Sequence, residues 1–111
     1  KGFDHVSQTL LDVPRAMPSP FRAQKLQKRS KLFDGVTRDE ECAALERTLQ
    51  STDEPSLAYA AFLLCNAARR ADVNLEMALA KLCDAFCEYY TAAEEKGDIP
   101  TLDAFRKTIF V

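Results

Sequence analysis

Residues 56–96 read SLAYAAFLLCNAARRADVNLEMALAKLCDAFCEYYTAAEEK and predict two long amphipathic helices. Apolar side chains recur at intervals of three and four residues, the spacing that gives a helix one buried face. The apolar positions are Leu57, Ala60, Ala61, Leu64 and Ala68 in the first helix, and Leu75, Ala78, Leu79, Leu82, Phe86, Tyr89, Tyr90 and Ala93 in the second. The hinge between them, residues 71–74, is short and predicts that the helices fold back antiparallel.

The segment before this pair predicts two more helices. Prolines 14, 18 and 20 predict an irregular lead over residues 1–20, in which Phe3, Val6, Leu10 and Leu11 suit a short turn or two that packs on the body. Strong helix formers then predict a helix over residues 20–33, with Gly35 as a left-handed cap.

A capping box at Thr37 and Glu40 predicts that the next helix covers residues 37–50, with Cys42, Leu45 and Leu49 facing inward. Pro55 is compatible with the first turn of the helix that follows, over residues 54–71. Gly97 ends the long helix over 74–96, and a short helix follows near 101–109. The predicted fold class is therefore all-α: an antiparallel bundle of four main helices plus a short C-terminal helix.

Composition supports one helical domain. The chain has 111 residues, of which 47% are hydrophobic and 29% charged, and it contains only 3 glycines. A net charge of -2 gives no general attraction to nucleic acid or membranes, so neither is expected as a partner. We see no membrane span and no signal peptide, and we expect a cytoplasmic location.

Cysteine usage favours reduced thiols. Cys42, Cys65, Cys83 and Cys87 all fall within predicted helices, on or beside an apolar stripe, where thiols act as small hydrophobic side chains. Cys83 and Cys87 are four residues apart and suit a shared metal, but the single histidine, His5, is remote. We therefore expect no zinc site.

Several segments resemble one known family. The run FLLCNAARR at 62–70, VNLEMAL at 73–79 and Phe86 are similar to the helix pair of the MazG family of nucleoside triphosphate pyrophosphohydrolases. LDVPRAMP at 11–18, FRAQKLQKR at 21–29 and Phe33-Asp34 resemble the entry to the C-terminal MazG domain. Together these segments cover most of residues 11–95.

The resemblance implies an all-α, dimeric protein that converts a nucleoside triphosphate to the monophosphate and pyrophosphate. In that family, Mg²⁺ is held by a Glu-Glu-x-x-Glu motif and a Glu-x-x-Asp motif on consecutive helices, where the spacing aligns carboxylate oxygens on one face. The metal neutralises phosphate charge and prepares a water nucleophile. The resemblance also implies that this chain is the C-terminal half of a longer protein with a second MazG domain.

The metal-binding acids of the family are largely replaced here. The Glu-x-x-Asp positions become Ser56 and Tyr59, neither of which supplies a carboxylate. The first motif is matched by Glu40 and Glu41, but its third acid becomes Ala44. A gapless count from Phe33-Asp34 instead gives Arg47, Thr48 and Ser51, with no acid at all.

Residues expected to bind the base and the phosphates are also replaced. The family's Trp after Phe-Asp, a stacking surface for the base, becomes Gly35. Family Asn, Lys and Arg positions near the last Phe become Cys83, Ala85, Glu88 and Tyr89. The candidates that remain are Glu40 and Glu41 as metal ligands, and Lys25, Lys28 and Arg29 as phosphate-binding residues. Asn66 and Arg69 also match family positions.

Each of these candidate residues also has a purely structural interpretation. Asp39, Glu40, Glu41 and Glu46 suit a helix start, where they favour the dipole and the cap. The basic residues suit a solvated face, and Tyr89 and Tyr90 suit core or dimer contacts. The first hypothesis is a catalytically inactive MazG-like domain that needs no cofactor, forms a homodimer and serves as a dimerisation or regulatory module. The second is an active Mg²⁺-dependent enzyme acting on a nucleoside triphosphate, with Glu40, Glu41 and Glu54 as relocated ligands.

Overall fold

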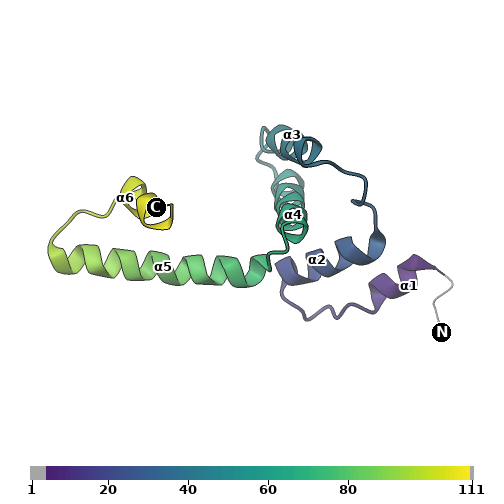
Figure 1. Ribbon diagram of the computed structural model, residues 1–111, viewed down its shortest axis with the longest axis horizontal. Helices are drawn as coiled ribbons and strands as arrows, with labels where there is room; N and C mark the ends of the chain where they lie inside the picture. The colour runs from purple at the N-terminus through teal and green to yellow at the C-terminus, as the bar shows by residue number, and fades with distance from the viewer. Residues whose placement is uncertain (1–4, 111) are drawn as a thin grey trace. The chain divides into compact units, whose positions relative to one another are not determined.

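The structure, a computed structural model, describes residues 5–110, and every regular element in that range is a helix (Figure 1). The prediction of an all-α chain is confirmed. The helices are α1 (Val6–Leu11), α2 (Ser19–Ser30), α3 (Arg38–Thr48), α4 (Glu54–Arg70), α5 (Leu75–Lys96) and α6 (Leu102–Ile109).

Side-chain caps begin three of these helices. The predicted capping box is present at α3: Glu40 N–H donates to Thr37 Oγ1 at 3.1 Å, and Thr37 N–H donates to Glu40 Oε1 at 2.9 Å. Asp53 caps α4 by accepting from Ser56 N–H at 3.0 Å, and Pro55 lies in the first turn, as expected. Thr101 caps α6 by accepting from Ala104 N–H.

Left-handed residues end the long helices. Gly97, with φ of 78°, ends α5, and Asp98 N–H then bonds to Ala93 O at 2.9 Å, which confirms the predicted end. Asp72, with φ of 60°, ends α4 in the same way, with Val73 N–H bonded to Ala68 O at 2.8 Å. Both ends are Schellman motifs, one of them built on an aspartate.

The predicted cap at Gly35 is wrong. Helix α2 ends earlier, where Lys31 adopts a φ of 61° and its N–H bonds to Gln27 O at 3.3 Å. The Phe33 ring then lies against Phe62 of α4, with centroids 6.0 Å apart, so the chain has already turned toward α4 before it reaches Gly35. Packing of this aromatic pair accounts for the earlier end.

The contacts group the chain into two units, one running to Glu76 and one beginning at Met77. In the first unit α4 is central: it contacts both α2 and α3, while α1 contacts α2 (Figure 1). The short turn or two expected within the lead is present as α1, which packs on α2, and its Thr9 carbonyl accepts from Arg29 Nη1 at 2.7 Å. Val13, also in this segment, is only 1% exposed. Phe3 lies outside the described residues.

Buried residues of the first unit are unusually polar. The apolar ones are Val13, Ala60, Leu63 and Cys65, and the polar ones are Gln24, Gln27, Glu41 and Asn66. The predicted inward face over residues 37–50 is partly wrong, because Cys42 of α3 and Leu49, the residue after α3, are exposed while Glu41 is buried. Hydrogen bonds from α4 to the Glu41 carboxylate explain the difference, since they rotate that residue into the interface.

The second unit is held by an aromatic cluster between α5 and α6. Phe105 of α6 is 7% exposed and packs edge-on against Phe86, with centroids 5.1 Å apart. The Tyr89 hydroxyl both donates to Thr101 O at 3.3 Å and accepts from Thr101 N–H at 3.1 Å. These contacts hold the start of α6 against α5. The antiparallel pairing of α4 with α5, and with it the four-helix bundle, stays a prediction.

None of the helices within residues 5–110 combines the length and the apolar character that crossing a membrane requires.

Candidate functional site

The most highly connected polar group of the first unit centres on Glu41 and Asn66. Glu41 is 4% exposed and Asn66 is 0% exposed, one on α3 and the other on α4. Asn66 Nδ2 donates to Glu41 Oε2, and Arg70 Nε donates to Glu41 Oε1 at 3.3 Å. Arg69 Nε and Nη2 donate to Asn66 Oδ1 at 3.0 and 2.8 Å. The four side chains form a continuous network that ties α3 to the end of α4.

This network compensates a buried charge. Arg70 also donates through Nη2 to the Val36 carbonyl, just before α3. Both oxygens of the Glu41 carboxylate therefore have donors, as a buried carboxylate requires. The neighbouring cations Arg69 and Arg70 also repel a divalent metal ion, so the arrangement suits a structural link better than a Mg²⁺ site.

Glu40, the other candidate metal ligand, is exposed and forms half of the capping box. Its hydrogen bonds with Thr37 hold the pKa of the Glu40 carboxyl below 4.5, its usual value. Hydrogen bonds with Ser56 and Ser51 likewise lower the pKa of Asp53 from 3.8. Because both folded-state pKa values are depressed, the caps stabilise the fold above these unfolded values and lose that effect as pH falls through the folded ones.

The positions expected from the resemblance to hold metal ligands lie apart in this structure. Glu41 contacts Asn66 and Arg70, whereas the replaced positions Ser56 and Tyr59 lie at the other end of α4. Ten residues separate Ser56 from Asn66, which is about 15 Å along a helix. Glu54 is exposed in the first turn of α4, at the end away from Glu41. Glu41, on α3, and Glu54, at the start of α4, are therefore not brought together.

The three basic candidates lie on α2 and have different surroundings. The Lys25 ammonium lies 5.0 Å from the centroid of the Phe21 ring, a cation–π contact. Arg29 Nη1 is bonded to the Thr9 carbonyl, which anchors α1. Lys28 is exposed in the last turn of α2, near the negative end of the helix dipole. Their assignment to phosphate binding stays a prediction.

Two buried glutamines were missed from the sequence. Gln24 Nε2 donates to the carbonyls of Cys65 and Val73, both at 3.0 Å, and Gln27 Nε2 donates to the Phe62 carbonyl at 2.8 Å. Gln27 Oε1 is buried and has no hydrogen-bond partner among residues 5–110. Their spacing of three residues on α2 is the only sequence signal, since it places both amides on the face that meets α4.

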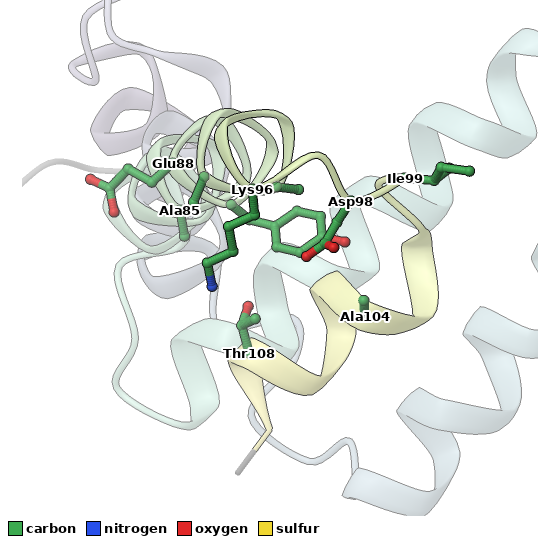
Figure 2. Close-up of a pocket in the computed structure, with 10 residues that line it drawn as sticks. Ala85, Glu88, Lys96, Asp98, Ile99, Ala104 and Thr108 are labelled. Atoms are coloured by element: carbon green, nitrogen blue, oxygen red, sulfur yellow. The ribbon is translucent and has the colours of Figure 1, made fainter.

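The largest cavity described in the second unit lies between α5 and α6 and measures about 800 Å³ (Figure 2). Alanines line much of it, among them Ala85 and Ala104, and the charged side chains of Glu88, Lys96 and Asp98 surround it. Figure 2 shows Lys96 extending toward Thr108 across the cavity. Because these charges are of mixed sign, the cavity does not favour an anionic over a cationic ligand.

Metal-ligating residues do not gather anywhere in the described part of the chain: no three His, Cys, Asp or Glu side chains within residues 5–110 are placed to share a metal ion. The four cysteines are free, with Cys65 buried and the others exposed. Burial raises the pKa of the Cys65 thiol above 9.0, its usual value, which keeps that thiol protonated.

Comparisons with protein-family models, with curated proteins and with solved structures each gave no match to this chain.

Proposed function

We propose that this chain is a MazG-like helical domain that lacks pyrophosphohydrolase activity and serves as a cytoplasmic dimerisation or regulatory module. The observation that carries this proposal is that the Glu41 carboxylate is buried and bonded to Asn66 and Arg70. Both oxygens of this carboxylate already accept hydrogen bonds, and a neighbouring guanidinium balances its charge, which favours a structural role over metal binding.

The replaced positions support the same conclusion. A two-metal phosphate site needs several carboxylates to offset the repulsion between cations and to hold both ions. On the alignment most favourable to activity, Ala44, Ser56 and Tyr59 remove three of the five family acids. Of the two that remain, Glu40 caps α3 and Glu41 joins α3 to α4.

Exposed apolar side chains support the role in association. Leu57 of α4, which does not line the groove between α3 and α4, is 47% exposed. On α5, four large apolar residues are 38–50% exposed: Leu79, Leu82, Phe86 and Tyr90. Apolar stripes of this kind mark surfaces that become buried against a partner. We assign them to a homodimer built mainly from the long helix pair.

The first test measures catalysis. We expect the unmodified chain to release no pyrophosphate from any standard nucleoside triphosphate in the presence of Mg²⁺, measured by a coupled pyrophosphate assay. The triple variant Ala44→Glu, Ser56→Glu and Tyr59→Asp should retain its helical circular dichroism, and isothermal titration with Mg²⁺ then asks whether metal binding returns. Turnover by the unmodified chain that Glu40→Gln or Glu41→Gln abolishes, while the helical circular dichroism of the variant is unchanged, would establish instead the active enzyme with relocated acids.

The second test measures association by sedimentation velocity. We expect a dimer at ~20 µM, an order of magnitude typical of a specific interface. Leu79→Glu should weaken the dimer at least about tenfold, because it introduces a charge into the apolar stripe. Lys81→Glu is the matched control, since Lys81 is exposed and two residues away on another face of α5. A monomer at this concentration would argue against the proposal.

A further inference from the structure

A second cavity, of about 440 Å³, lies in the groove between α3 and α4 of the first unit. Its lining includes Leu63, which is only 3% exposed, and Leu64, which is 47% exposed. Cys42 and Leu45 line it from α3, and Ala67 from α4. Small-molecule sites fall in the range of roughly 300–1,000 Å³ and are mostly apolar with few polar groups. In size and lining the groove meets that description.

Positively charged residues outnumber negatively charged ones in the lining of the groove. They comprise the guanidiniums of Arg38 and Arg70 and the carboxylate of Glu41. Glu41 and Arg70 neutralise each other, since Arg70 Nε bonds to Glu41 Oε1. Arg38 is the first residue of α3, beside the positive end of the helix dipole, and makes no ion pair within the described residues. The groove therefore carries one uncompensated positive charge on an otherwise apolar lining.

We propose that this groove binds a small anionic amphiphile, an unbranched apolar chain that ends in a carboxylate, such as a medium-chain fatty acid. The apolar chain lies against Leu45, Leu63 and Leu64, which removes hydrocarbon from water. The carboxylate pairs with the Arg38 guanidinium, whose geometry suits carboxylates. A cationic amphiphile of the same length meets the same apolar lining but is repelled at Arg38. Charge complementarity thus selects the anion.

Cys42 provides a reporter inside the groove. Its thiol is exposed and lines the cavity, whereas Cys83 is exposed on α5 in the second unit and lines neither described groove. A ligand of about ten carbons is expected to bind at roughly millimolar concentration. Decanoate at about 5 mM, below its micelle-forming concentration, should therefore slow alkylation of Cys42 by iodoacetamide about fivefold. Alkylation of Cys83 should not change, and peptide mass spectrometry reads both sites in one sample.

Two comparisons test the charge. Decyltrimethylammonium at the same concentration should leave the alkylation of Cys42 unchanged. Arg38→Gln should weaken decanoate protection about two- to fivefold, the range of an exposed ion pair. Arg47→Gln is the matched control, because Arg47 is exposed on the same helix but does not line the groove. It should leave protection unchanged.

Four results would overturn the proposal. Equal protection by the cationic amphiphile would show that Arg38 selects nothing, and equal slowing at Cys83 would show a general surfactant effect. If decanoate does not slow alkylation of Cys42 at all, the groove does not bind this ligand. A Cys42 thiol that is unreactive before any ligand is added, while Cys83 reacts, would show that the protein itself covers the groove. Recovery of that reactivity on dilution would then identify a second copy as the occupant.

Discussion

Replacing Asn66 with alanine is expected to lower the free energy of unfolding by about 2–4 kcal/mol. The Asn66 side chain is fully buried and joins Glu41 on one side to Arg69 on the other. Without it, the Glu41 carboxylate loses a donor in a site from which water is excluded, and a small cavity remains. Urea denaturation followed by far-ultraviolet circular dichroism measures the change.

The control for Asn66→Ala is Glu46→Gln, which removes a charge from an exposed position on α3. It should shift the unfolding free energy by less than about 0.5 kcal/mol, as surface changes usually do. Asn66→Asp should be at least as damaging as the alanine variant, because it places a second carboxylate against Glu41. If Asn66→Ala unfolds at the same urea concentration as the control, the network carries no stability and the structural role assigned to Glu41 is wrong.

Replacing Phe105 with alanine should release α6 from α5. Phe105 is the only buried residue of α6, and it contacts Phe86 and Tyr89 with ring centroids 5.1 and 5.7 Å away. Loss of a buried phenylalanine typically costs about 3–5 kcal/mol. An eight-residue helix cannot offset that loss, since isolated helices of this length are marginal. Backbone amides of α6 should therefore exchange with deuterium at least about 100-fold faster.

Phe110→Ala is the matched control for this experiment. Phe110 is also a phenylalanine and lies directly after α6, but it is 68% exposed and contacts the guanidinium of Arg106. Its replacement should leave deuterium exchange within α6 nearly unchanged. If Phe105→Ala and Phe110→Ala behave alike, the aromatic cluster does not hold α6, and the cap at Thr101 or another contact must do so.

Helix positions were largely predictable because the signals that end helices are local. The capping box at Thr37 and Glu40, Pro55 in a first turn and Gly97 with a positive φ each act within a few residues of the boundary. Such signals do not depend on the rest of the chain. The error at Gly35 arose where a distant residue intervened, since the Phe33 ring packs on Phe62 of α4.

The role of the candidate site residues was less predictable. Glu41 belongs to a helix start rich in acids, and nothing in that pattern distinguishes it from Glu40 or Glu46. It is buried because Asn66 and Arg70, 25 and 29 residues later, supply donors. Gln24 and Gln27 likewise bond to carbonyls 35 to 49 residues away. The sequence expectation named Glu41 as a metal ligand and did not include its contact with Asn66.

For this protein, the order of residues along the chain was enough to establish an all-helical class and the approximate limits of α2 to α6. Helix formation depends on the i to i+4 spacing of apolar groups and on caps within one turn, and both are visible in a sequence. Only the tertiary structure decided that Glu41 is buried and that Cys42 and Leu49 are exposed. It also decided that α3 and α4 form a groove lined by Arg38, which makes no ion pair with any residue from 5 to 110. These outcomes follow from which helix faces meet, because burial and charge pairing are set by partners far away in the chain.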